Sequence, residues 1–193
     1  MEVVNKMKVN VGVSNHHVHL TKETWESLFG DKPMIKRNDL SQKGEFATIE
    51  TVNLENNNKI LEHVRIVGPF RKYDQIEISE SDANYLEIFP PSRQSGDLKD
   101  TPGITLIGPC GKVALNNGVI IAENHIHMNP NMSSSLGLNN KQILYVYNNQ
   151  DFLFEAKLKV SDNGVLELHI DRDQSKLYNL ETGSKVDFKV CGK

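Results

Sequence analysis

The chain has 193 residues, of which 38% are hydrophobic, and its 22 basic and 25 acidic side chains give a formal net charge of −3. This length allows one domain or two small domains of about a hundred residues each. The charge balance creates no broad positive field, which excludes nucleic acid and anionic membranes as favoured partners. No signal peptide or membrane-spanning apolar run is present, and Met1 to Lys8 is too short for a targeting helix with a linker. We therefore expect a cytoplasmic protein without a targeting extension.

Short β-branched or alternating segments, separated by Gly, Asn and Pro, recur along the whole chain and are typical of β-strands. Helical segments are few and short, which favours a mainly β fold of two small β-barrels over a parallel α/β sheet. Asn116-Asn117-Gly118 and Asp162-Asn163-Gly164 are hairpin-turn signals. The expected strands are 9–13, 46–54, 59–67, 104–107, 112–115, 118–122, 143–147, 152–160, 165–170 and 185–190.

Two segments of the chain match each other around a pair of histidines. In a strand, residues i and i+2 face the same side about 7 Å apart, so a His-x-His sequence presents two imidazoles to one side. An offset of 108 relates His17-Val18-His19 to His125-Ile126-His127, and it also relates Leu20, Ser27 and Leu28 to Met128, Ser135 and Leu136.

A fainter repeat, at an offset of 92, supplies a third residue for each histidine pair. It aligns Ile76-Glu77-Ile78 with Leu168-His169-Ile170, so that Glu77 takes the place of His169. In all four segments the candidate ligand ends an apolar run, and a helix-capping residue and a short helical stretch follow. We therefore expect the ligands to meet at one rim, where the strands end and short capping helices begin. The expected capping residues are Thr21, Ser79 or Ser81, Asn129 before Pro130, and Asp171 or Asp173.

Three donors in each cluster predict two metal sites, with a position left open for water or substrate as in catalytic zinc sites. The alternative, in which each His-x-His is a surface strand or a hydrogen-bonded core pair, accounts less well for two copies with matching third residues. His16 and His63 are interpreted as ordinary polar strand residues. Cobalt, nickel or iron could take the place of zinc. The predicted ligands are His17, His19 and Glu77 for one ion and His125, His127 and His169 for the other.

Arg71 lies in the segment Gly68 to Gln75, which follows a strand and immediately precedes the strand that carries Glu77. Its guanidinium has fixed, forked donors that suit a phosphate group. A solvated turn with an ordinary surface arginine is an equally good interpretation of this segment alone. The stretch 92–103, rich in Ser, Gly and Pro, could be a ligand-binding lip or a plain connection.

Nine motifs follow one another over nearly the whole chain: 11–20 (VGVSNHHVHL), 40–47 (LSQKGEFA), 50–52 (ETV), 64–71 (VRIVGPFR), 75–79 (QIEIS), 95–98 (SGDL), 101–103 (TPG), 125–128 (HIHM) and 166–171 (LELHID). Together they resemble the propanediol-utilisation type phosphate acyltransferases, also called phosphate propanoyltransferases. The combination and order of these motifs are highly specific for that family.

The resemblance implies a reversible exchange of a short acyl group between coenzyme A and inorganic phosphate. It also implies two β-barrels with a dinuclear zinc site between them, one barrel formed by residues 1–15 plus 123–193 and the other by 16–122. Carried over to this chain, Arg71 would hold phosphate, and Ser14, Arg65 and His169 would lie near coenzyme A. The six predicted ligands would hold two zinc ions. A homodimer and a role in propanediol degradation, in the cytosol or in a bacterial microcompartment, are further implications.

The chain departs from the family pattern at several positions. His16 and Asn124 stand where the family usually has arginine, and these two sites are related by the same offset of 108. Asn38-Asp39 replaces Lys-Pro, and Lys176 replaces an asparagine. The six ligand positions are kept. Loss of two guanidinium groups lowers the local positive potential, which leaves phosphate affinity, coenzyme A affinity and acyl preference open.

A mechanism without a protein nucleophile follows from this chemistry. A thiol with a pKa of about 8.5 is mostly protonated at neutral pH, and coordination to zinc deprotonates it. Our hypothesis is that one zinc holds the coenzyme A sulfur, while the other and Arg71 stabilise developing negative charge. Cys110 and Cys191 lie outside the ligand segments and are expected to be free thiols. A dinuclear zinc hydrolase of a phosphate or acyl ester and a non-catalytic metal-binding module are the alternatives.

Overall fold

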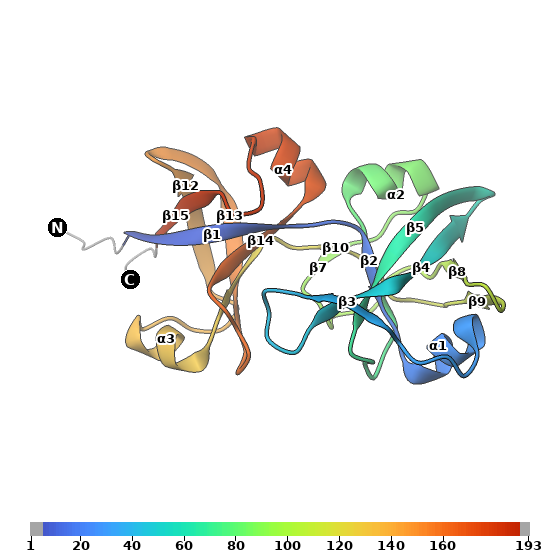
Figure 1. Cartoon of the computed structure of the whole chain (residues 1–193). Coiled ribbons are helices and arrows are strands. Elements are labelled where there is room, and N and C mark those ends of the chain that lie inside the picture. Colours follow the sequence, from blue (N-terminus) through green and yellow to red (C-terminus); the bar gives the residue numbers. More distant parts are fainter. Residues whose placement is uncertain (1–5, 190–193) are drawn as a thin grey trace. The chain divides into compact units, whose positions relative to one another are not determined.

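Strands are the main regular structure of residues 6–189, the part of the chain that the computed structural model describes. The chain divides into a barrel unit, Met1–Ser14 with Glu123–Lys193, and a sheet unit, Asn15–Ala122 (Figure 1). Four helices of six to eight residues accompany the strands of the described part. The predicted mainly β class with short helices is confirmed. Cys191 and the end of the strand expected over 185–190 lie outside the described residues.

The barrel unit contains β1 (Lys6–Ser14), β11 (His125–Met128), β12 (Ile143–Asn148), β13 (Asp151–Val160), β14 (Glu167–Asp171) and β15 (Lys185–Lys189). These strands close into a barrel in the order β1-β14-β11-β13-β12-β15. β1 runs parallel to β14 and β11 parallel to β13, whereas the other neighbours are antiparallel. The N-terminal strand is therefore an integral part of a barrel whose other strands come from the C-terminal part of the chain.

The sheet unit contains β2 (His17–His19), β3 (Lys36–Asp39), β4 (Phe46–Asn56), β5 (Lys59–Gly68), β6 (Gln75–Glu77), β7 (Ser92–Arg93), β8 (Thr105–Ile107), β9 (Lys112–Ala114) and β10 (Val119–Ala122). They form one nine-stranded sheet in the order β7-β10-β6-β2-β5-β4-β8-β9, with β3 paired to β4. Within the described residues this path ends at β7 and β9, so the second module is a curled sheet, whereas the module around β1 is a closed barrel. β3 and β7 were not expected from the sequence.

Both hairpin signals proposed from the sequence are wrong. β9 pairs with β8 and β10 pairs with β6 and β7, so the turn at 116–118 joins strands that are not neighbours. The turn at 162–164 similarly joins β13 to β14, which lie on opposite sides of β11. A true two-residue hairpin occurs at Asn57 and Asn58, between β4 and β5, where both residues have positive φ angles of 47° and 61°. Asparagine tolerates this left-handed conformation, which matches the twist of a tight hairpin.

Each strand that carries a candidate ligand leads into a capped helix. The helices are α1 (Lys22–Phe29), α2 (Glu80–Leu86), α3 (Pro130–Ser135) and α4 (Arg172–Tyr178), and they follow β2, β6, β11 and β14. The side chains of Thr21, Ser79, Asn129 and Asp171 accept hydrogen bonds from backbone N–H groups in the first turns. Capping satisfies backbone N–H donors that the first turn of a helix leaves unpaired. The capping residue therefore fixes where the helix begins and, with it, where the preceding strand ends. The helix starts expected from the sequence are confirmed.

Alternation along the ligand strands separates core side chains from polar ones. In β11, Ile126 and Met128 are fully buried in the core of the barrel unit. In β2, Val18 is fully buried in the core of the sheet unit. Because successive strand residues point to opposite faces, the histidines on either side of Ile126 and Val18 share the face away from the core.

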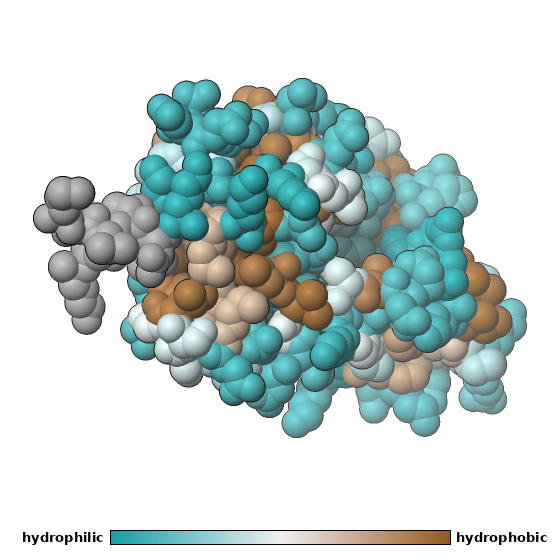
Figure 2. All heavy atoms as spheres, turned by 60° about the vertical axis from the view of Figure 1, so that its left-hand side comes forward, coloured by the Kyte–Doolittle hydropathy of each residue, from teal (hydrophilic) through white to brown (hydrophobic). Residues whose placement is uncertain are grey.

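The face shown in Figure 2 is mostly hydrophilic, with hydrophobic residues gathered in places. In the barrel unit, the large apolar side chains with high exposure include Ile143, Phe152 and Leu177. Among residues 6–189, no helix has the length and apolar character needed to cross a lipid bilayer.

Candidate metal centres

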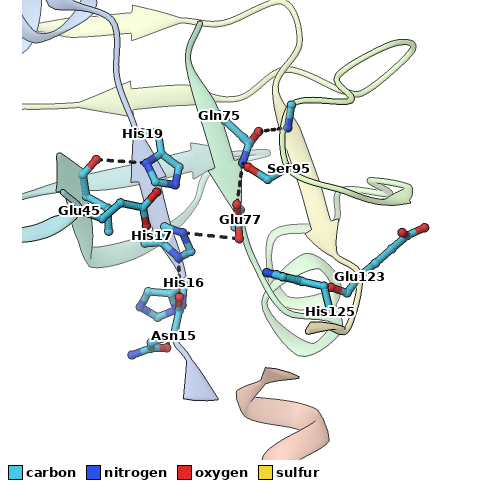
Figure 3. Close-up of polar contacts among 12 residues, drawn as sticks. Asn15, His16, His17, His19, Glu45, Gln75, Glu77, Ser95, Glu123 and His125 are labelled. Carbon is cyan, nitrogen blue, oxygen red and sulfur yellow. Dashed lines mark hydrogen bonds and ion pairs between the residues drawn. The ribbon is translucent and has the colours of Figure 1, made fainter. Parts of the chain in front are cut away.

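His17, His19 and Glu77 form one cluster in the sheet unit. Each offers one ligand atom, and these atoms lie within 4.8 Å of one another. β2 and β6 are antiparallel neighbours, and His17 is the direct cross-strand partner of Glu77. The His17 Nε2 atom lies 3.5 Å from Glu77 Oε2 (Figure 3). Strand pairing therefore brings together two residue types that are 60 positions apart in the sequence, and all three donors face one point.

Hydrogen bonds orient both imidazoles of this cluster. The Nδ1 atom of His17 lies 2.9 Å from the carbonyl oxygen of Asn15, and Nδ1 of His19 lies 3.1 Å from that of Val67. A carbonyl oxygen only accepts hydrogen bonds, so each Nδ1 carries the proton and each Nε2 keeps its lone pair. Histidines that ligate metals usually have such a partner at the second nitrogen.

Burial lowers the pKa of His19 well below its usual range, and electrostatic interactions with the neighbouring His17 and Arg71 act in the same direction. Glu77 and the Val67 carbonyl oppose this shift. His19 is 3% exposed. The imidazole is therefore neutral at physiological pH, which is the form that can bind a metal ion.

The second cluster lies in the barrel unit and consists of His125, His127 and His169, whose ligand atoms also lie within 4.8 Å of one another. β11 and β14 are antiparallel neighbours, and His125 is the direct cross-strand partner of His169. The rings of His127 and His169 approach to 4.5 Å between centroids. The two clusters are thus built in the same way, with a His-x-His strand beside an antiparallel strand that carries the third residue.

Two imidazole nitrogens face each other in the barrel unit. His125 Nδ1 lies 2.7 Å from the carbonyl oxygen of Glu123, and His125 Nε2 lies 3.1 Å from His127 Nε2. The contact to Glu123 repeats that of His17 to Asn15, at the same offset of 108. Burial lowers the pKa of His127 to about 2, and the positive charges of His125, His169 and Lys159 add to this effect. His127 is therefore neutral, and its Nε2 atom converges with that of His125 in a way that suits a shared cation.

The donor sets of both clusters fit a divalent transition metal. Two imidazoles with a carboxylate, or three imidazoles, are typical of catalytic zinc sites, which use three protein ligands. Cobalt, nickel and iron accept similar donors. The Nδ1 atom of His127 is buried without a hydrogen-bond partner, so this ring is held by packing and by its Nε2 contact. Desolvated neutral imidazoles that converge on one point are costly unless a proton or a cation lies between them.

Arg71 is fixed next to the cluster of the sheet unit. Its backbone N–H donates to the carbonyl oxygen of Leu20, the residue after His19, at 2.9 Å. Its guanidinium donates from Nη2 to Glu45 Oε1 at 2.7 Å and from Nη1 to Ser95 Oγ at 3.2 Å. The side chain of Arg71 is 22% exposed, so it is partly accessible to a bound anion.

The two residues expected near coenzyme A occupy different units. Ser14 ends β1 and is the strand partner of Asp171. Arg65 lies in β5 beside His17 and donates from Nη1 to the carbonyl oxygens of Thr48 and Ile49, at 2.8 and 3.1 Å.

The two positions where arginine was expected carry ordinary polar contacts. His16 Nδ1 lies 3.2 Å from Asp82 Oδ2, and Asp82 belongs to the capping box of α2. The backbone oxygen of Asn124 accepts a hydrogen bond from the N–H of Lys157 at 2.9 Å. His16 is therefore a polar residue tied to the start of α2, but it lies between β1 and β2 and not within a strand as expected.

Sequence reasoning missed the side chains that support these clusters. Gln75, which is fully buried, contacts both Glu77 and Ser95 (Figure 3). In the barrel unit, Glu167 contacts His169. The signal was present, because the offset of 92 that relates Glu77 to His169 also relates Gln75 to Glu167.

Fold and clusters together define a mainly β protein with two sets of three converging side chains of the types that can hold a metal ion. Residues 10–181 match the family model described as phosphate propanoyltransferase. A phosphate propanoyltransferase of Thermotoga maritima is 42% identical over 91% of this chain and 86% of its own length. Those of Rhodopseudomonas palustris and Salmonella typhimurium are 38% and 36% identical, over 98% and 91% of this chain and 85% of their own lengths.

The chain therefore belongs to the phosphate propanoyltransferase family, a family of phosphotransacylase enzymes. This confirms the resemblance stated on the sequence motifs. The matched region, 10–181, contains all six candidate ligands and Arg71.

Proposed function

We propose that the protein catalyses the reversible transfer of a short acyl group between coenzyme A and inorganic phosphate, with two divalent metal ions, zinc in the first place, bound per chain. Family membership supports the reaction. The observation that carries the metal assignment is the pair of three-donor clusters on equivalent strands of the two units.

In this proposal His17, His19 and Glu77 hold one ion, and His125, His127 and His169 hold the other. The ions would stabilise the thiolate of coenzyme A and the negative charge of the tetrahedral transition state. The residues 1–15 plus 123–193 and 16–122 would be the two domains, and each would hold one ion. Coenzyme A would contact Ser14, Arg65 and His169.

Arg71 would bind the phosphate substrate. A guanidinium forms paired, charge-assisted hydrogen bonds with phosphate oxygens. The contact of the Arg71 backbone with Leu20 holds this side chain beside the strand end that carries His19. Phosphate bound there would lie next to a cation, which lowers the repulsion between an anionic nucleophile and the developing negative charge.

The protein requires no nucleophilic side chain in this scheme, because phosphate itself attacks the thioester carbonyl. The thiolate of coenzyme A leaves, and acyl phosphate is released. We further propose that the reaction takes place in the cytosol or in a bacterial microcompartment that degrades propanediol, and that the protein acts as a homodimer.

The discriminating experiment mixes the purified protein with propanoyl or acetyl phosphate and coenzyme A and follows thioester absorbance, while inorganic phosphate is measured in parallel. Acyl transfer predicts equal amounts of thioester and phosphate. Phosphate release without thioester would replace this proposal with that of a metal-dependent hydrolase. Neither product, in protein that contains its metals, would indicate a non-catalytic metal-binding module.

A further inference from the structure

We propose that Gln75 and Glu167 are equivalent positioning residues, each of which orients the third metal ligand of its own unit: Gln75 orients Glu77 and Glu167 orients His169. This inference rests on the proposed metal sites, and it assigns a role to two side chains outside the six ligands.

The equivalence of the two residues follows from strand register. In the sheet unit, β6 pairs antiparallel with β2, and Gln75 is the direct partner of His19. In the barrel unit, β14 pairs antiparallel with β11, and Glu167 is the direct partner of His127. Each residue thus lies opposite the second histidine and two positions before the third ligand. It therefore shares a face of the sheet with both of them.

Gln75 is held by a complete set of hydrogen bonds. Its Nε2 atom donates to Glu77 Oε1 at 2.6 Å and to Ser95 Oγ at 2.9 Å. Its Oε1 atom accepts from the backbone N–H of Gly96 at 2.7 Å. The amide orientation follows from this network, because a flipped amide would place its oxygen against the Glu77 carboxylate and its NH₂ against the Gly96 N–H. A fully buried amide with these three partners has one orientation.

The contact fixes how Glu77 can bind a metal ion. One carboxylate oxygen, Oε1, is engaged by Gln75, and the other, Oε2, is the atom nearest His17 Nε2 at 3.5 Å (Figure 3). Gln75 therefore favours binding through a single oxygen. Ser95 Oγ also accepts from Arg71 Nη1, so the same chain of hydrogen bonds connects the metal ligand to the candidate phosphate-binding group.

Gly96 is part of this support. Its φ angle of +95° is one that side chains with a Cβ atom rarely adopt, and a Cβ atom there would approach the Tyr73 hydroxyl to 3.1 Å. Its backbone N–H can reach Gln75 because the loop turns tightly at this point, where the Asp97 N–H donates to the Gln94 carbonyl oxygen. The loop that sequence analysis left as either a lip or a plain connection thus holds the ligand support in place.

Glu167 contacts its ligand as a hydrogen-bond acceptor, whereas Gln75 contacts Glu77 as a donor. Its Oε2 atom lies 2.6 Å from His169 Nε2. A carboxylate is suited to an imidazole N–H, just as an amide NH₂ is suited to the carboxylate of Glu77. With the Nε2 proton shared in this way, the lone pair of His169 is on Nδ1, and a carboxylate partner makes that nitrogen a stronger donor.

Gly12 leaves room for this carboxylate–imidazole pair. It is the strand partner of His169 on β1, and a Cβ atom at Gly12 would come within 3.0 Å of Glu167 Cδ and 3.1 Å of His169 Cδ2. The absence of a side chain at this position is a second observation, independent of the hydrogen bond. It indicates that Glu167 and His169 need the space that a side chain at Gly12 would occupy.

The test replaces each residue with methionine, which keeps the volume but removes the polar contact. Gln75→Met and Glu167→Met are each expected to weaken metal binding by about 10- to 100-fold. The affinity is measured by competition with a chromogenic chelator, in proteins that retain only one cluster. For Gln75→Met the cluster of the barrel unit is removed by His125→Ala with His127→Ala. For Glu167→Met the cluster of the sheet unit is removed by His17→Ala with His19→Ala. Gln142→Met and Glu155→Met, outside both clusters, are the matched controls and should leave the affinities unchanged.

Cobalt absorption provides a readout that a merely structural role would not change. Cobalt-loaded Gln75→Met should show an altered visible spectrum, because Glu77 is released from its single-oxygen geometry, while metal-free protein keeps its thermal unfolding midpoint to within a few degrees. Glu167→Gln retains a hydrogen-bond acceptor and should recover part of the affinity that Glu167→Met loses. An equal loss in both Glu167 variants would overturn the positioning role.

Unchanged affinity and an unchanged cobalt spectrum in Gln75→Met would also overturn the inference. These outcomes are separable from failure of the proposed function. If the wild-type protein binds two metal ions but transfers no acyl group, the proposed reaction fails while the metal-affinity comparison still tests Gln75 and Glu167.

Discussion

The guanidinium of Arg71 and the carboxylate of Glu45 form an ion pair, with Nη2 and Oε1 2.7 Å apart. The pair is partly exposed, with side chains 22% and 35% accessible, so water screens the attraction and its contribution to stability is small. Together with the hydrogen bond from Nη1 to Ser95, the ion pair nevertheless holds the guanidinium of Arg71 in one orientation. The residue that we assign to phosphate is therefore oriented before the substrate arrives, which reduces the entropy lost on binding.

Arg71→Ala is expected to raise the KM for phosphate by about 10- to 100-fold, since a hydrogen bond to a charged group contributes about 1.5–3 kcal/mol. Metal content should stay the same, because Arg71 is not among the clustered ligands. Arg71→Lys keeps the positive charge but loses the paired donors of the guanidinium. Its KM for phosphate should therefore lie between those of the wild-type protein and Arg71→Ala. Steady-state kinetics with varied phosphate and elemental analysis check both statements. An unchanged KM in Arg71→Ala would remove the phosphate assignment.

Cys110→Ser should leave turnover and metal content unchanged. Cys110 is an exposed free cysteine and belongs to neither ligand cluster, and the proposed reaction forms no covalent bond to the protein. Activity assays on the variant and on wild-type protein treated with a thiol-alkylating reagent measure this. A variant that loses turnover while it retains two metal ions would require a protein nucleophile and would contradict the proposed mechanism.

Local signals in the sequence were sufficient to identify the side chains that converge in the two clusters, and the helix starts. His-x-His places two side chains on one face of any strand, whichever strands lie beside it, and a cap such as Thr21 or Asn129 acts within three residues of its own position. The offset of 92 then identified Glu77 and His169 as equivalent, and the strand register agrees with this.

Long-range pairing could not be read from local signals. The turns at 116–118 and 162–164 have hairpin sequences, but parallel pairing of β10 with β6, and the position of β11 between β13 and β14, override them. Lys36–Asp39 is exposed at every residue and shows no alternation, so β3 was not expected. The contact of Gln75 with Ser95 depends on a loop 20 residues away, which no periodic pattern predicts.

Removal of either histidine pair should halve the metal content. Each cluster is complete within its own unit, so His17→Ala with His19→Ala is expected to lower bound metal from about two ions per chain to about one, and His125→Ala with His127→Ala should do the same. Elemental analysis of protein purified without chelators measures this. His63→Ala, an exposed residue outside both clusters, is the control and should retain both ions. Loss of both ions from a single pair would contradict two independent sites.

Metal-free protein should lose stability as the pH falls below about 6.5. In the folded chain, burial lowers the pKa of His19 well below its usual range and that of His127 to about 2. In the unfolded chain both imidazoles have a pKa of about 6.5, so the unfolded state binds more protons at acidic pH and is favoured there.

Between pH 7.5 and pH 5.0, His127 should lower the free energy of unfolding by about 2 kcal/mol, because 1.5 pH units below an unfolded pKa of about 6.5 correspond to about 1.4 kcal/mol per unit. His19 should act in the same direction. Urea unfolding of metal-free protein at the two pH values measures the total. The variant with His19→Gln and His127→Gln isolates the contribution, since its free energy of unfolding should depend less on pH over this interval, by at least the contribution of His127. Equal pH dependence in the two proteins would mean that these imidazoles are not kept neutral by the fold, and the same neutral form is what both candidate sites need in order to bind a metal ion.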